Sequence, residues 1–281
     1  MLSIPPRATT RVVAPDGVAV AVQDWATPGS AGHKPDVLLV HGFSQSHGCW
    51  LPQVASPLAQ QLRLVTYDLR GHGASDKPDS APLYQSSAAW AGELQSVITQ
   101  TGLHKPVLVV WSYAGRIALD YLDRYGDSQI SGLMMVNATS HTHSDFMGPA
   151  ARLLAQTCDP DPAISDPAVI AMLQACVAQP LPDDEFAYML AYNRLVPAAL
   201  RAHLRKHTRD YQAVLQSLKV PVRVIHGELD AINLLAMSQH TVAHVPQARL
   251  SVYEGVAHTP FWEAPARFNT ELAQFVSESR P

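Results

Sequence analysis

A serine lies where an apolar, strand-like segment meets a helix-like one. Val107 to Trp111 is uniformly apolar, and Arg116 to Leu122 has apolar residues at helical spacing. A serine in such a strand-to-helix turn is exposed at the carboxyl end of a sheet, where its hydroxyl can act as a nucleophile. The start of the following helix also favours negative charge that develops nearby. Ser112 is therefore a candidate nucleophile; the alternative is a serine that only caps the helix.

The turn departs in part from the G-x-S-x-G pattern of serine nucleophiles. Small residues are expected on both sides of the serine, because strand and helix approach closely there. The two glycine positions of the pattern are occupied by Val110 and Ala114, although Gly115 follows directly. The downstream side thus meets the steric requirement, and the upstream side does not.

Partners for a serine follow later in the chain, in the order Ser, Asp, His. Asp230 comes after an apolar segment that ends at His226, and His258 lies in a loop before the last helical pattern. A histidine with a pKa near neutrality can take the serine proton. An acid on its other ring nitrogen fixes the tautomer. Glu228 is a competing acid, two residues away.

Other polar residues near predicted strand ends have less specific roles. Asp68 precedes Ser112 in the chain and is expected to be a turn residue, and Asn137 lacks the charge that an orienting acid supplies. His141 and His143, with Asp145, could ligate a metal, but no second cluster supports this, so we expect no metal and no cofactor. Three histidines in glycine-containing turns are expected to be structural: His41, His72 and His226.

Short apolar segments alternate with helical patterns along most of the chain. Such segments suit interior strands of a parallel sheet that is covered on both faces. The predicted strands are Thr10 to Val13, Val18 to Val22, Asp36 to His41, Leu64 to Tyr67, Val107 to Trp111, Gly132 to Asn137 and Val220 to His226. The predicted helices are Ala88 to Thr101, Tyr113 to Tyr125 and Ala266 to Ser279. The alternation predicts an α/β fold with a doubly wound, mostly parallel sheet.

One long segment interrupts the alternation. Thr139 to Val214 contains no convincing strand and has several helix-start signals. A crossover needs far fewer residues, so we predict a helical lid at 139–214, inserted into a core formed by 1–138 and 215–281. The alternative is an ordinary run of crossover helices.

The ordered motifs closely resemble those of the α/β-hydrolase superfamily, in its lid-bearing serine esterase-like branch. The resemblance runs from about Val18 to Val276 and rests on the segments around His41, Asp68, Ser112, Asp230 and His258. It implies a catalytic triad of Ser112, Asp230 and His258. It also implies an oxyanion hole formed by the backbone N–H groups of Phe43 and Tyr113. The expected activity is cleavage of an ester-like acyl bond through an acyl-enzyme.

The substrate pocket is less well specified. Trp111 precedes the serine and could face either the pocket or the core. A lid must present one face to the cleft, so lid aromatics are candidate contacts; with Trp111 the candidates are Phe146, Phe186, Tyr188 and Tyr192. Basic residues at helical spacing near the end of the lid are expected to be solvated: Arg201, Arg205, Lys206 and Arg209. Without a fixed cation in the pocket, a small, neutral and largely apolar ester is the expected substrate.

The same triad serves other reactions. Acyl transfer, hydrolysis of a carbon–carbon bond next to a ketone, and cofactor-free oxygenase or perhydrolase chemistry all stay open. A small-molecule receptor that turns over slowly is a further alternative. Dehalogenases and epoxide hydrolases of this fold carry an aspartate where Ser112 stands, which argues against both.

Composition limits the remaining classes. The 281 residues are 47% hydrophobic and 16% charged, with a net charge of −4, which excludes a disordered chain. No basic run indicates a nucleic-acid partner. We expect no signal peptide, no membrane span and a cytoplasmic location. The three cysteines, Cys49, Cys158 and Cys176, are expected to be reduced, although one disulfide is open, and the oligomeric state is not predicted.

Overall fold

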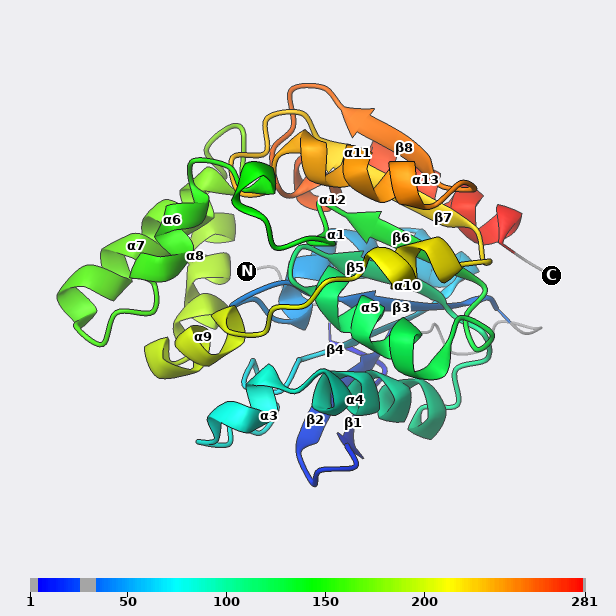
Figure 1. Cartoon of the computed structure of the whole chain (residues 1–281), viewed down its shortest axis with the longest axis horizontal. Helices are drawn as coiled ribbons and strands as arrows, with labels where there is room; N and C mark the ends of the chain where they lie inside the picture. The colour runs from blue at the N-terminus through cyan, green and yellow to red at the C-terminus, as the bar shows by residue number, and fades with distance from the viewer. Residues whose placement is uncertain (1–4, 26–33, 280–281) are drawn as a thin grey trace.

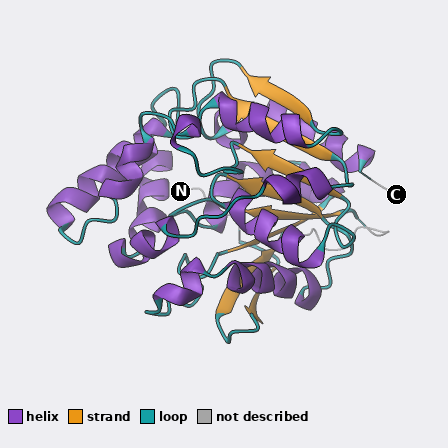
Figure 2. Ribbon diagram, viewed as in Figure 1, coloured by secondary structure: helices purple, strands orange, loops and turns teal. Residues whose placement is uncertain are grey.

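A single eight-stranded sheet organises the molecule. The computed structural model describes residues 5–25 and 34–279. The strands are β1 (Ala8–Val13), β2 (Ala19–Asp24), β3 (Asp36–Val40), β4 (Arg63–Tyr67), β5 (Val107–Trp111), β6 (Gly132–Val136), β7 (Val222–Gly227) and β8 (Arg249–Tyr253). Their order is β1-β2-β4-β3-β5-β6-β7-β8, and all neighbours from β4 to β8 pair in parallel. The predicted fold class is confirmed (Figures 1 and 2).

Helices cover both faces of the sheet. Figure 1 shows four of them on the near face: α4 (Ser87–Gln100), α5 (Ala114–Tyr125), α10 (Gln212–Ser217) and α11 (Leu235–His244). The remaining core helices are α1 (Leu51–Val54), α2 (Leu58–Gln61), α3 (Ala81–Gln85), α12 (Pro260–Glu263) and α13 (Pro265–Glu278), with the 3-10 turn η1 (His47–Trp50). This double cover explains why β3, β5 and β6 are apolar along their whole length: every residue in them is buried.

The segment predicted as a lid is helical. After the 3-10 turn η2 (Ser144–Phe146) come α6 (Ala151–Gln156), α7 (Pro162–Ala175), α8 (Asp183–Arg194) and α9 (Ala198–Arg205). Figure 1 shows α6 to α9 beyond one edge of the sheet. The next helix, α10, crosses the predicted boundary after residue 214 and packs on α5 and α11 of the core. The chain has therefore returned to the core before that boundary.

The parallel strands end at the same edge of the sheet, and the loops that follow them adjoin α6 to α9. Val40, Trp111, Val136 and Gly227 are the last residues of β3, β5, β6 and β7. The candidate residues follow these ends within a few positions, as is usual for active sites of open α/β sheets. Among the described helices, none combines the length and the apolarity needed to cross a membrane.

Candidate active site

Ser112 has a strained backbone at the junction of β5 and α5. Its φ is +54°, a left-handed conformation that non-glycine residues rarely adopt and that costs of order 1–3 kcal/mol. The surrounding backbone fixes it there: the Ser112 N–H donates to the Val136 carbonyl at 3.0 Å. The Ser112 carbonyl accepts from the N–H groups of Gly115 and Thr139, each at 2.9 Å. Ser112 therefore lies in a tight strand-to-helix turn, and its side chain lines a cavity.

The steric demand at this turn falls on Gly115. A Cβ at Gly115 would lie 2.8 Å from the Thr139 carbonyl oxygen and 3.0 Å from the Ala138 Cβ. Val110 and Ala114, at the two glycine positions of the pattern, are fully buried. The departure from G-x-S-x-G thus leaves the turn intact, because close contact between helix and neighbouring strand occurs one residue later.

The loop after β3 runs beside Ser112. A Cβ on Gly42 would lie 3.0 Å from the Ser112 Cβ, so only glycine lets the loop approach this closely. Within the described chain, the backbone N–H groups of Phe43 and Tyr113 donate no hydrogen bond. Their rings pack edge to face, with centroids 6.3 Å apart. Two unengaged N–H donors thus flank the turn that holds Ser112.

Two buried histidines hold this loop. His41 Nε2 accepts from the Leu69 N–H at 3.0 Å, and its Nδ1 lies 2.9 Å from the Gly42 carbonyl. His72 Nε2 accepts from the Ser44 N–H at 3.2 Å, and its Nδ1 lies 2.9 Å from the Arg70 carbonyl. In both rings one nitrogen accepts and the other donates, which requires neutral imidazole. Burial lowers the pKa of His41 to about 4 and that of His72 to about 3. Both are structural, as expected.

Arg201 also reaches this loop, so its predicted solvation is wrong. Its side chain is buried, and its Nε donates to Ser44 Oγ at 2.9 Å. Its two terminal nitrogens donate to the Thr157 and Asn193 carbonyls, at 3.1 and 2.8 Å. Leu200 and Leu204 flank it on the buried face of α9. Arg201 therefore fastens three parts of the 139–214 segment to the loop beside Ser112.

His258 and Asp230 form a close pair. The His258 Nδ1 lies 2.7 Å from Asp230 Oδ2, and both side chains are buried. The other carboxylate oxygen accepts from the backbone N–H groups of Ile232 at 2.8 Å and Asn233 at 3.0 Å. Burial alone would raise the Asp230 pKa, but the His258 charge and its hydrogen bond outweigh burial and lower that pKa. The ionised form of Asp230 is therefore favoured, and its carboxylate contacts the Nδ1 side of the imidazole.

The competing acids are engaged elsewhere. Glu228 is exposed and accepts from the Gly255 N–H at 3.2 Å. Asp68 pairs with His47 Nδ1 at 2.8 Å, which fits its expected place in a turn. Asn137 does contact the pair: its Nδ2 donates to Asp230 Oδ2 at 2.6 Å. This hydrogen bond was not predicted, because the sequence shows only that Asn137 lacks the charge of an orienting acid.

The backbone of His258 is held from two sides. Its carbonyl accepts from Trp111 Nε1 at 2.8 Å, and the ring centroids of the two residues are 5.5 Å apart. Its N–H donates to the Cys176 carbonyl at the end of α7, at 3.0 Å. Glu263 reinforces this junction, since it accepts from the N–H groups of Ala178 and Ala257 at 2.6 and 3.0 Å. The 139–214 segment thus helps to position His258.

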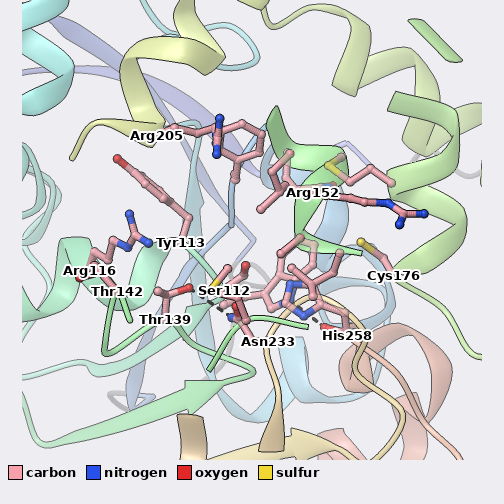
Figure 3. A pocket seen from close by; sticks show the side chains of 18 of the residues that line it. Ser112, Tyr113, Arg116, Thr139, Thr142, Arg152, Cys176, Arg205, Asn233 and His258 are labelled. Carbon is pink, nitrogen blue, oxygen red and sulfur yellow. Dashed lines mark hydrogen bonds between the residues drawn. The ribbon is translucent and has the colours of Figure 1, made fainter. Parts of the chain in front are cut away.

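A cavity of about 410 Å³ lies over Ser112 and His258 (Figure 3). The core contributes Phe43, Gln45, Trp111, Ser112, Tyr113, Arg116, Ile232, Asn233 and His258 to its lining. The segment predicted as a lid contributes Thr139, Thr142, Met147, Ala151, Arg152, Leu154, Met172, Cys176, Arg205 and Thr208. The cavity is large enough for a small ligand and is enclosed by both parts of the chain.

Of the five predicted pocket residues, only Trp111 lines this cavity. Phe146 packs against His240, with ring centroids 5.1 Å apart. Tyr188 and Tyr192 pack edge to face on α8 at 5.4 Å, and Phe186 packs against the hydrophobic core. Tyr192 also lines a much smaller pocket that shares Trp111 and Cys176 with the main cavity. None of the four side chains lines the main cavity, so its lining corrects the prediction.

The expectation of a cavity without a fixed cation is also wrong. Arg116, Arg152 and Arg205 line it, and no Asp or Glu is among the lining residues. Arg209, by contrast, pairs outside the cavity with Asp123 at 2.8 Å. The premise for a neutral, apolar substrate therefore fails.

The other candidate ligands do not gather into a metal site. His143 Nδ1 lies 3.4 Å from Asp145 Oδ2, and both side chains are exposed. Across residues 5–25 and 34–279, no three His, Cys, Asp or Glu side chains are placed to hold a metal ion. The three cysteines are free thiols.

Comparison with known proteins gives a consistent family. A model of the alpha/beta hydrolase family matches residues 37–271. A candidate aryl esterase from Burkholderia cenocepacia has 31% identity and a TM-score of 0.92, covering 97% of this chain and 99% of its own. The esterase RhEst1 from Rhodococcus sp. ECU1013 has 29% identity and a TM-score of 0.89, with coverage of 97% and 99%.

A sequence relative agrees. The pimeloyl-[acyl-carrier protein] methyl ester esterase of Nitrosomonas europaea is 27% identical over 262 residues, which is 85% of this chain and 94% of that protein. The family match spans most of the chain. The three similar proteins are named as esterases, and each is matched over nearly its full length. The chain therefore belongs to the alpha/beta hydrolase family, in its esterase-like branch.

Proposed function

We propose that this enzyme hydrolyses small carboxylic esters through an acyl-enzyme on Ser112. The observation that carries the proposal is a serine with φ of +54° that lines the same cavity as a histidine paired with a buried aspartate. The strained turn presents the hydroxyl, and the Asp230 carboxylate leaves His258 Nε2 as the nitrogen that can accept its proton.

The reaction has two halves. Ser112 Oγ attacks the ester carbonyl carbon while His258 Nε2 takes the hydroxyl proton. The bond to the alcohol oxygen breaks, and the alcohol leaves with that proton. Water then attacks the acyl-enzyme, gives a proton to His258 and releases the acid as Ser112 regains its hydrogen. The backbone N–H groups of Phe43 and Tyr113 hold the oxyanion in both halves, and losing one such donor typically costs about 2.7–4 kcal/mol of barrier.

We also propose that residues 139–214 form a cap over the site. Ten of the cavity-lining residues come from this segment, and Cys176 and Arg201 hold the His258 loop and the Phe43 loop. A cap that contacts both loops would keep water out and couple substrate binding to the geometry of the catalytic groups.

Burst kinetics test the acyl-enzyme. With 4-nitrophenyl acetate, rapid mixing should release a burst of nitrophenol approaching one equivalent per enzyme if deacylation is slower. Ser112→Ala should abolish both burst and turnover. Ser277→Ala makes the same substitution at an exposed serine on α13 and should retain turnover. Full turnover in Ser112→Ala would overturn the proposal.

A further inference from the structure

The charges around the cavity have one sign. The lining residues include the three arginines Arg116, Arg152 and Arg205, and no Asp or Glu. Figure 3 places Arg116 and Arg205 on the Tyr113 side of the cavity and Arg152 on the Cys176 side. Fixed cations in an enclosed cavity attract anions far more strongly than the same groups do in water.

Arg116 is the most informative of the three. It lies four residues after Ser112, on the first turn of α5, and is largely enclosed. One terminal nitrogen donates to the His207 carbonyl at 2.7 Å, and the guanidinium lies 5.7 Å from the centroid of the Tyr113 ring. Its buried Nε has no hydrogen-bond partner among the described residues. A buried guanidinium normally has its donors satisfied by an acceptor or an anion.

The acid on the next turn of α5 lies close to groups other than Arg116. Asp120 lies one turn further along α5, but its carboxylate oxygens lie 2.6 Å from His207 Nε2 and 3.1 Å from the Tyr211 hydroxyl. Arg209 also approaches Asp120, at 3.9 Å. No ion pair within 4 Å joins Arg116 to a carboxylate within the described residues, although the charge of Asp120 acts on it from further away and raises its pKa. The protein therefore compensates the charge of Arg116 only in part.

Arg205 adds a second positive charge to the same side. It is the last residue of α9. Burial is the main cause that lowers the pKa of Arg116, and the charge of Arg205 lowers that pKa further. Arg205 also interacts with the Cys158 thiol, which is a weak partner for a guanidinium. Two arginine charges on one side of a cavity without a carboxylate repel each other, and an anion bound near both would reduce that cost.

We propose that the preferred substrates are esters that also carry a carboxylate, which Arg116 and Arg205 bind while the ester lies against Ser112. The inference rests on the proposed esterase function and names its substrate class. Arginine suits this role because its planar donors match the two oxygens of a carboxylate. Arg152 and Arg205 are both exposed, so water and salt screen their charges, and the half-buried Arg116 should contribute most. Arg205 lies on the same side of the cavity as Arg116, whereas Arg152 lies on the other side (Figure 3).

The test compares esters of equal shape and different charge. The probes are the ethyl half-esters of succinate, glutarate and adipate, each beside the ethyl ester of the corresponding monoamide. The amide replaces one carboxylate oxygen by NH₂, which removes the charge at nearly equal shape and turns one acceptor into a donor. For at least one chain length, kcat/KM should be about tenfold or more higher for the carboxylate ester. A ratio of one or below at all three lengths would overturn the proposal.

The variants locate the effect. Arg116→Gln and Arg205→Gln should each move the carboxylate-to-amide ratio toward one. Arg209→Gln, which removes an arginine paired outside the cavity, should leave the ratio unchanged. An unchanged ratio in both cavity variants would show that these arginines do not bind the carboxylate and would refute the assignment.

A binding measurement separates this proposal from the catalytic one. Calorimetry on Ser112→Ala should show tighter binding of the carboxylate half-ester than of its amide, and adding Arg116→Gln should remove the difference. If the wild type turned over no ester but this difference persisted, the esterase proposal would fail and the carboxylate site would stand. Equal binding of the two probes would refute the site independently of turnover.

Discussion

Replacing Asp230 by Asn tests the proposed orientation of His258, because it changes one atom. The carboxylate accepts four hydrogen bonds: from His258 Nδ1, Asn137 Nδ2 and the backbone N–H groups of Ile232 and Asn233. An amide has one acceptor oxygen. If this oxygen faces the two backbone N–H groups, both keep an acceptor. The NH₂ group then points at His258 and Asn137.

The consequence for His258 is a change of tautomer. With a donor opposite it, Nδ1 must accept, and the ring proton moves to Nε2, which can then no longer take the Ser112 proton. We expect kcat to fall by about four orders of magnitude, or about 5 kcal/mol of barrier. The Asn137 donor also loses its acceptor, which should lower the free energy of unfolding by about 1–3 kcal/mol.

The assay is steady-state hydrolysis of 4-nitrophenyl acetate, with urea unfolding of the same samples. Glu228→Gln is the matched control, since it is the same acid-to-amide change two residues away on an exposed side chain. It should leave kcat within about twofold. Near-normal turnover in Asp230→Asn, or an equal loss in Glu228→Gln, would refute the assignment of Asp230.

Three further predictions concern the supports of the site. Because His41 and His72 are neutral when folded, with pKa values of about 4 and 3, the unfolded chain takes up their protons first as the pH falls below about 6.5. Urea titrations should show the free energy of unfolding falling by on the order of 4 kcal/mol from pH 7 to pH 5; a flat profile would contradict this. Arg201→Gln should cost about 2–5 kcal/mol, because three buried acceptors lose a donor, whereas Arg209→Gln should cost under about 1 kcal/mol in the same urea experiment; equal losses would count against the buried contacts. Gly115→Ala should lower thermal stability by about 1–3 kcal/mol and reduce kcat, since the added Cβ meets the backbone of the neighbouring strand end; wild-type values in both would show that the turn tolerates a Cβ.

The interior of the fold was predictable because its physical signal is local. Strands buried on both faces must be apolar at every position, and the segments identified from the sequence agree with β3 to β7 within two residues at either end. Strand β8 was missed. Its residues Arg249 to Tyr253 are mostly half-exposed at the sheet edge, so no uniform apolar run marks it.

The catalytic candidates were identifiable from their order and from the turns that follow strands, but the cavity lining was not. Composition shows that a helix is amphipathic and does not show which helix faces the cleft. Arg201 appeared solvated from its spacing, yet it lies on the same buried face as Leu200 and Leu204. Arg116 received no role from the sequence, and its only signal was its position one helical turn after Ser112.

Covalent labelling tests the central claim most directly. A fluorophosphonate should add a single label to the native enzyme, and peptide mass spectrometry should place it on the peptide that contains Ser112. Heat-denatured enzyme, in which the turn and the His258–Asp230 pair are lost, should not react. A label on any other residue, or equal labelling of the denatured chain, would contradict the assignment of Ser112 as the activated nucleophile.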